Sequence, residues 1–139
     1  MMSLRIVLAM FLALAGLFGI AALPQKLCPF QAPMGEAGLR KYRATKRVAP
    51  VYPTESLKNG ISGKVVVDIL VDEYGKVPEA KVNQAPDELT GQAVIDAAKQ
   101  WKFKAPPKIQ GRQICYSSTL SFRFEIRNGK GKVVDDPVN

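Results

Sequence analysis

Residues 50–67, PVYPTESLKNGISGKVVV, hold the junction that decides the fold. Pro53 suits the first turn of a helix, where its missing N–H costs nothing, and Gly60 suits the left-handed residue just past a helix end. The polar residues 54–59 between them therefore predict one short helix. From residue 64 to residue 72 apolar and polar side chains alternate, which is the pattern of a half-buried strand. The junction thus predicts a short helix followed directly by the first strand of a sheet.

A turn and a second strand follow. The sequence DEYGK, residues 72–76, predicts a turn in which Gly75 supplies the positive φ. A weaker strand is predicted over residues 76–83. Pro78 cannot donate to a strand ladder, so this strand is expected to lie at an edge of the sheet or to contain a bulge.

A second helix is predicted after residue 86, with Asp87 or Thr90 as its N-cap. One apolar stripe recurs along it at helical spacing: Val94, Ala97, Ala98 and Trp101. Trp101 is therefore expected to pack in the core rather than to serve as a binding platform.

The last strand is predicted over residues 114–126, ICYSSTLSFRFEI. Alternate side chains of a strand point to opposite faces, which separates two sets. The apolar face carries Tyr116, Ser118, Leu120, Phe122, Phe124 and Ile126, and the polar face carries Cys115, Ser117, Thr119, Ser121, Arg123 and Glu125. Residues 48–127 are thus predicted to be an α+β domain, a three-stranded antiparallel sheet with two helices packed on one face. The polar tail, residues 128–139, is expected to be frayed.

Composition argues against an enzyme. The chain of 139 residues has no histidine, which removes the commonest general bases and zinc ligands. Asp68 and Asp72 share a strand face, but four residues of strand separate their Cα atoms by ~13 Å, too far for a shared metal or proton. No catalytic residue, metal site or cofactor is predicted. The net charge of +8 favours anionic partners, although nucleic acid is not expected for an exported chain.

The N-terminus predicts export. An uncharged run, residues 6–23, follows Arg5 and allows two interpretations of residues 1–23. A cleaved signal peptide would end at small residues near Ala22, whereas an uncleaved anchor would use the whole run, because ~17–25 apolar residues span a bilayer. Residues 24–47 are predicted to be a linker, since they hold three prolines and a basic cluster with no apolar period.

Two cysteines, Cys28 and Cys115, are too far apart in sequence for a CxxC redox motif. In an oxidising compartment they are a disulfide candidate that would contribute ~2–4 kcal/mol and lay part of the linker over the sheet. Two free thiols, or pairing between chains, are the alternatives.

Three segments resemble a known family: residues 50–77, residues 95–107 (IDAAKQWKFKAPP) and residues 122–126 (FRFEI). The marks within them, in order, are Tyr52, Pro53, Gly60, Gly63, Gly75, Trp101 and Phe103. This ordered set resembles the C-terminal domain of TonB-like energy transducers. Tyr52 and Pro53 have two interpretations, shaping a peptide site or packing and starting the helix.

The resemblance implies a periplasmic α+β domain that binds the TonB box, a short extended segment of outer-membrane transporters. Binding is implied to be strand addition at the edge formed by the last strand. An edge strand offers unpaired N–H and C=O groups to an incoming peptide, which agrees with strand addition at the last strand. The implied peptide-binding residues are Tyr116, Ser117, Ser118, Thr119, Leu120, Ser121 and Phe122.

The sequence departs from TonB proper at three places. Residues 6–23 lack the polar Ser and His pair that the family uses to couple to the ExbB and ExbD motor, so that partnership is not expected. The linker is too short to cross a periplasm of usual depth. Ala49 stands where TonB proper carries a glutamine near the bound peptide.

Two hypotheses follow for function. The first is a non-enzymatic periplasmic protein, exported by a signal peptide or tethered to the inner membrane by residues 6–23. It would bind an outer-membrane transporter peptide or another envelope protein, within TonB-dependent transport. The second is a secreted or membrane-tethered structural module of the cell envelope that forms a homodimer by strand exchange without energy transduction.

Overall fold

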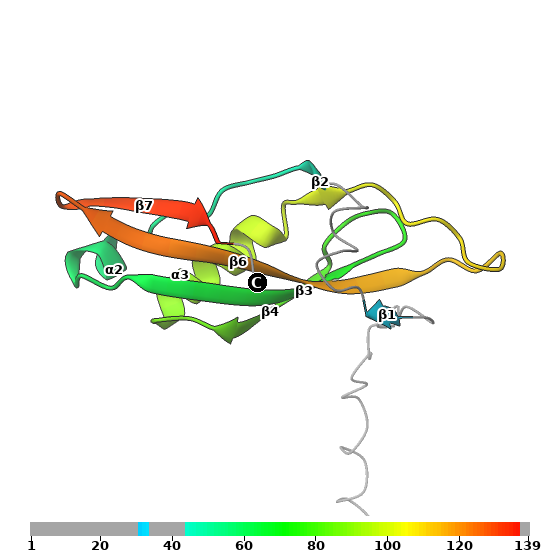
Figure 1. Ribbon diagram of the computed structural model, residues 1–139, viewed down its shortest axis with the longest axis horizontal. Helices are drawn as coiled ribbons and strands as arrows, with labels where there is room; N and C mark the ends of the chain where they lie inside the picture. The colour runs from blue at the N-terminus through cyan, green and yellow to red at the C-terminus, as the bar shows by residue number, and fades with distance from the viewer. Residues whose placement is uncertain (1–30, 34–43, 137–139) are drawn as a thin grey trace, which may run out of the picture.

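The computed structural model describes residues 31–33 and 44–136 (Figure 1). Residues 6–23, for which a signal peptide or an anchor is predicted, lie outside the described residues. Within the described part of the chain, neither helix is long and apolar enough to cross a bilayer.

Three antiparallel strands form the centre of the main sheet: β3 (Gly63–Val71), β4 (Glu79–Gln84) and β6 (Cys115–Arg127). β3 lies between the other two and pairs with β6 from Gly63↔Phe124 to Val71↔Tyr116. Its pairing with β4 contains a register shift between Val66 and Val67. These are the three strands that the sequence predicts, and the α+β class is confirmed.

Two further strands pair with β6 on its other side. β7 (Lys130–Asp135) is antiparallel to the second half of β6, and β1 (Gln31–Pro33) runs parallel to its first three residues. The sheet therefore has five strands rather than three. The expectation of a frayed tail after residue 127 is wrong for β7. β1 is a short strand within residues 24–47, the segment predicted to be a linker.

The β6–β7 hairpin has a local cause. Asn128 and Gly129 have φ of 51° and 71°, as a two-residue turn with positive φ at both positions requires. An Asn-Gly pair at the end of a strand is a strong hairpin signal. The polar composition of the tail hid this signal, because β7 carries lysines on an exposed edge.

Two helices complete the domain. α2 (Thr54–Lys58) lies at the end of the sheet where β3 begins, and α3 (Glu88–Ala98) contacts β3, β4 and β6 (Figure 1). The apolar stripe of α3 is buried against the sheet, with Val94 fully inaccessible and Ala98 1% exposed. Burying such a stripe is what stabilises a short helix in a protein.

Asp87 links the two helices. As the N-cap of α3, its Oδ1 accepts from the Thr90 N–H at 2.9 Å, while its Oδ2 accepts from the Ser56 hydroxyl of α2. Burial would raise the pKa of Asp87, but the hydrogen bonds from Ser56 and Thr90 outweigh it, so the pKa lies below its usual value. The sequence predicts this N-cap, whereas the contact with Ser56 is a tertiary feature.

A small second sheet lies beside the main one. β2 (Ala44–Lys46) pairs antiparallel with β5 (Lys102–Phe103), with a register shift between Ala44 and Lys46. The backbone of Phe103 is hydrogen-bonded to the turn after β3, because its N–H donates to Gly75 O at 2.8 Å. β2, like β1, is a short strand within the predicted linker, residues 24–47.

The core lies between α3 and the sheet. The fully buried valines of β3 contact the aromatic side chains of β6, and Trp101 meets Phe122 edge to face at 6.1 Å between ring centroids. The Trp101 Nε1–H donates to Val48 O at 2.8 Å, which satisfies the polar end of the indole. Trp101 is 6% exposed, so the prediction that it packs in the core is confirmed.

Candidate functional site

The seven residues predicted to bind a peptide lie along one strand, β6. Tyr116, Ser118, Leu120 and Phe122 are buried on the core side, whereas Ser117 is exposed and Thr119 half-buried on the opposite, open face. The alternation is the one that the sequence predicts. Ser121 departs from it, because it lies on the open face and yet is buried.

The backbone edge of β6 is occupied over most of its length. Strand β3 covers one side, and on the other side β1 pairs with Cys115–Ser117 while β7 pairs from Phe122 onward. The Asp136 N–H also donates to Ser121 O at 3.0 Å. Only Ser118–Leu120 has no described strand on its outer side. The expectation that the last strand forms the sheet's open edge is therefore wrong for most of its length.

The reason is topological. Sequence alternation identifies the two faces of a strand but not its neighbours within the sheet. β1 comes from a segment without apolar alternation, and the polar tail hid the Asn128-Gly129 hairpin signal for β7, so β6 was predicted to be an edge strand.

The open face beside this edge is polar and shallow. Directly paired residues form two rows across the sheet, Ser117–Leu70–Glu79 and Thr119–Asp68–Lys81. Thr119 Oγ1 donates to Asp68 Oδ1 at 2.9 Å.

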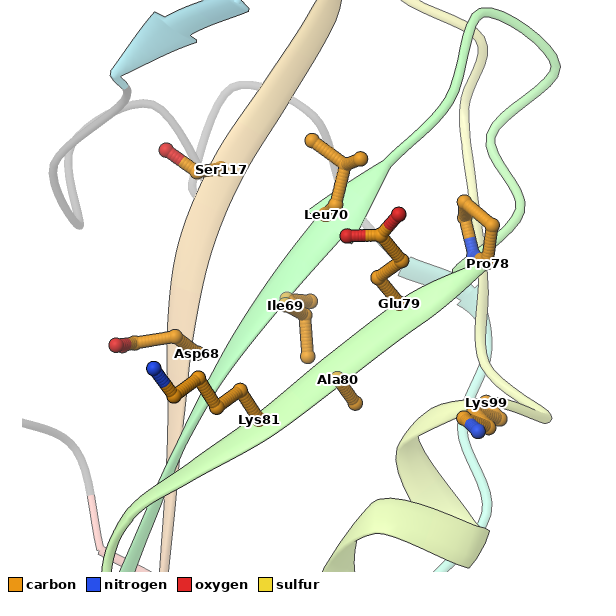
Figure 2. Close-up of a pocket in the computed structure, with 9 residues that line it drawn as sticks. All are labelled: Asp68, Ile69, Leu70, Pro78, Glu79, Ala80, Lys81, Lys99 and Ser117. Atoms are coloured by element: carbon orange, nitrogen blue, oxygen red, sulfur yellow. The ribbon is translucent and has the colours of Figure 1, made fainter. Parts of the chain in front are cut away.

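An open hollow of about 410 Å³ lies along β3 and β4, and Lys99 at the C-cap of α3 also lines it. Figure 2 shows Asp68 and Lys81 side by side at one end and Leu70 beside Glu79 further along. Ser117 contributes to the hollow from β6. Lone carboxylates without an adjacent nucleophile or base do not form a catalytic set. The hollow instead offers mixed polar contacts to a side chain that reaches over the sheet.

Tyr52 supports the end of β6 rather than its open edge. Its hydroxyl donates to Ile61 O, and its ring meets Phe124 edge to face at 5.1 Å between centroids. A Cβ added at Gly131 of β7 would lie 2.6 Å from the Tyr52 ring, so β7 covers this side chain closely. Burial, and then the charge of Asp87, raises the pKa of Tyr52. These contacts are those of a packing residue.

The family-motif glycines also serve the scaffold. Gly60, Gly63 and Gly75 all have positive φ, of 67°, 145° and 80°. Gly75 has a second constraint, because a Cβ there would lie 2.0 Å from Phe103 O. Pro53 is the N-cap of α2 and Phe103 is 5% exposed in the core. The structure therefore places the motif residues around the candidate edge, not on it.

Cys115 begins β6 and is 1% exposed. Its Cα partner in the parallel register is Gln31 of β1, three residues after Cys28 in sequence. Cys28 lies outside the described residues, so its pairing with Cys115 stays a prediction.

Comparison with known proteins gives consistent results. The chain is 30% identical over 81 residues to a protein named Protein TonB from Vibrio cholerae serotype O1, a match that covers 58% of this chain and 33% of that protein. It is 28% identical over 83 residues to Protein TonB from Yersinia enterocolitica, covering 59% of this chain and 32% of that protein. The chain therefore matches about a third of the length of these curated relatives.

The fold has a solved counterpart, the solution NMR structure of the Pseudomonas aeruginosa TonB CTD. The TM-score is 0.52 at 24% identity, and the match covers 63% of this chain and 88% of that one. Residues 48–126 match the family described as Gram-negative bacterial TonB protein C-terminal. With more than half of its residues in that match, in the order and fold described above, the chain belongs to the TonB C-terminal domain family.

Proposed function

We propose that this protein is a non-enzymatic, periplasmic TonB-like protein that binds an extended peptide by strand addition to β6. The observation that carries the proposal is β1, three residues that already lie parallel against Cys115–Ser117. The outer edge of β6 is thus shaped to accept an extended segment through main-chain hydrogen bonds. The three residues beyond it, Ser118–Leu120, have no described strand on that side and would continue the same ladder.

A peptide bound there replaces β1. Main-chain bonds to residues 115–120 supply its affinity, and its alternate side chains lie on the open face beside Ser117 and Thr119, near the hollow over β3 and β4. β1 is only three residues long, so its displacement gives up few hydrogen bonds, each with a net contribution of about 1 kcal/mol. A longer peptide forms more main-chain hydrogen bonds than β1 does, because it also pairs with Ser118–Leu120.

The partner we propose is the TonB-box peptide of an outer-membrane transporter, within TonB-dependent transport. The family match and the name Protein TonB of the relatives support this choice. Export by a signal peptide or tethering by residues 6–23 is part of the same proposal. Coupling to an ExbB and ExbD motor is not, because residues 6–23 carry no polar side chain.

The register of β1 supports a disulfide between Cys28 and Cys115. A disulfide requires Cα atoms about 4.4–6.8 Å apart, and three residues of chain reach at most ~10 Å from Gln31, the partner of Cys115. Such a bond would hold β1 at the edge that the peptide needs, so we expect the peptide to displace β1 only where this bond is reduced, and the titration below is run with reductant.

The alternative function, a module that dimerises by strand exchange, would use β4, whose outer side has no partner among the described strands. Pro78 precedes this strand, and Glu79 and Lys81 carry charges along it. Proline and charged residues are the features that protect an edge strand from pairing with another copy. The β6 edge therefore carries the stronger proposal.

The test is a titration of the isotope-labelled protein with TonB-box peptides, followed by amide chemical shifts. We expect shifts that concentrate at Cys115–Leu120 and at the amides of Gln31 and Ala32, since β1 leaves as the peptide binds. A peptide of the same length and net charge with proline at alternate positions is the control, because those positions cannot donate to the ladder. Unchanged β6 amides at saturating peptide would reject the proposal.

A further inference from the structure

The small second sheet aligns three lysines from segments far apart in sequence. Lys102 of β5 is directly opposite Lys46 of β2 on one side, and it forms an isolated antiparallel bridge with Lys76 on the other. Residues that face one another across strands project on the same side of the sheet, with Cβ atoms ~4.5–5.5 Å apart. We call Lys46, Lys76 and Lys102 the lysine row.

A bulge creates one half of this row. Ala44 pairs with Phe103, so regular antiparallel pairing would set Thr45 opposite Lys102, yet the register shifts and Lys46 takes that place. Thr45 instead donates through Oγ1 to Lys102 O at 3.2 Å. Bulges redirect a side chain in this way.

The row has no carboxylate to neutralise it. All three lysines are exposed, and among the described residues no ion pair involves them, whereas the acidic residues 125, 135 and 136 each pair with a basic side chain elsewhere. Of the acids just before Lys76, Asp72 has its Oδ1 occupied by the N–H groups of Tyr74 and Lys76, and Glu73 Oε2 lies 3.8 Å from Cys115 Sγ. Like charges directly opposite one another destabilise a sheet, so a bound anion would relieve the arrangement.

The positive surface continues along the loop that follows. Between Asp96 and Glu125 the sequence contains no acidic residue, and Lys104, Lys108 and Arg112 are exposed in the loop 104–113. Figure 1 shows this loop, in yellow to orange, projecting at the same end of the molecule as the green turn after β3.

Two exposed apolar side chains lie at this basic end. Ile109 is 46% exposed at the tip of the loop, where it exchanges backbone hydrogen bonds of 3.0 and 2.9 Å with Arg112 across a turn. Tyr74 is 60% exposed in the turn after β3. A membrane interface has a layer of charged headgroups above the boundary of the acyl chains. Basic residues suit the headgroup layer, and exposed apolar and tyrosine side chains suit the acyl boundary. A soluble polyanion would have no use for the apolar pair.

We propose that the lysine row, with the loop 104–113, is a docking surface for an anionic lipid bilayer. The ammonium groups contact headgroup phosphates, while Ile109 and Tyr74 enter the interface. The surface uses residues of β2, β5, the turn after β3 and the loop 104–113. It borders the peptide site proposed on β6, since Glu73 in that turn lies 3.8 Å from Cys115, but it contains none of residues 115–120. A protein held this way presents its peptide-binding edge at a set height above the lipid.

The experiment measures the acetylation rate of each lysine by mass spectrometry in the full chain, with vesicles of phosphatidylcholine alone or mixed with phosphatidylglycerol. We expect the phosphatidylglycerol vesicles to slow acetylation of Lys46, Lys76 and Lys102 and leave Lys58 and Lys130, at the other end of the molecule, unchanged. Any insertion of residues 6–23 is common to both vesicle types. Added salt should reverse the protection, because it screens the headgroup charge.

A triple variant tests whether the row itself binds. K46Q/K76Q/K102Q should lower the phosphatidylglycerol-dependent protection of Lys104 and Lys108, with an affinity loss of about 100-fold if each lysine contributes roughly fivefold. The matched control K58Q/K130Q/K132Q has the same net charge. Equal loss in both variants, or equal protection of all lysines, would overturn the proposal. Equal protection by soluble polyphosphate together with an unaffected I109S variant would assign the row to a soluble polyanion instead.

Discussion

Asp87 is the residue at which the two helices and the sheet are joined. Its carboxylate caps α3 through Thr90 and holds α2 through Ser56. Replacing an N-cap with alanine typically costs about 1 kcal/mol, and loss of the Ser56 contact adds to this. We expect Asp87→Ala to lower the free energy of unfolding by about 1–2 kcal/mol at neutral pH, measured by urea denaturation.

The same residue gives a pH dependence with a definite sign. Because the pKa of Asp87 is lower in the folded protein than in the unfolded chain, its stabilisation is present above the unfolded pKa and is lost as pH falls through the folded value. The difference in stability between the wild type and Asp87→Ala should therefore shrink below about pH 4. The control is Glu88→Ala, because Glu88 is an exposed residue in the first turn of α3. Its stability should differ less from that of the wild type at neutral pH than the stability of Asp87→Ala does. A difference that persists undiminished in acid would contradict the assignment.

Among single elements, β1 is the one whose removal should change binding most. Ala32 is the middle residue of this three-residue strand, and proline there removes a backbone N–H from the ladder. Because β1 occupies the site that the peptide needs, we expect Ala32→Pro to raise peptide affinity, by about tenfold if the pairing contributes about 1.4 kcal/mol. Isothermal calorimetry measures the change.

Ala32→Ser is the matched control for this variant, since it changes the side chain and keeps the N–H. Its peptide affinity should equal that of the wild type. An affinity in Ala32→Pro no higher than in Ala32→Ser would show that β1 does not compete with the peptide.

At the scale of the whole molecule, the folded unit extends beyond the residues of the family match. Val133 of β7 packs against the core, Gly131 covers Tyr52, and Asp136 pairs with Arg123 at 2.8 Å. Next to β7, Arg47 pairs with Asp135 at 3.7 Å, and its guanidinium carbon lies 5.4 Å from the centroid of the Trp101 ring. These contacts are absent from a fragment that stops at the family boundaries.

We therefore expect fragment 48–127 to be less stable than fragment 44–136. Loss of about 2 kcal/mol would lower the midpoint of thermal unfolding by roughly 8–16 °C for a domain of this size. Circular dichroism during heating measures both fragments. Equal midpoints would show that β7 and β2 attach to a core that is already complete.

The three central strands and the two helices could be predicted from sequence because their signals are local. Alternation in residues 64–72 and 114–126, the stripe of α3 and the cap at Asp87 all follow from interactions within a few residues. Positive φ at Gly60 and Gly75 was likewise predicted from the turns that they end or form. For the same reason Trp101 was correctly placed in the core.

The candidate site was less predictable, because it depends on what lies beside β6. The sequence by itself determined which side chains of residues 116–122 face the core and which face solvent, since that alternation belongs to one strand. Only the tertiary structure decided that β1 pairs with this strand and that Lys46, Lys76 and Lys102 form one row. Strand neighbours and rows of like charge arise from pairing between distant segments, and the hydrogen bonds that select such pairings are made by a backbone that is the same at almost every residue.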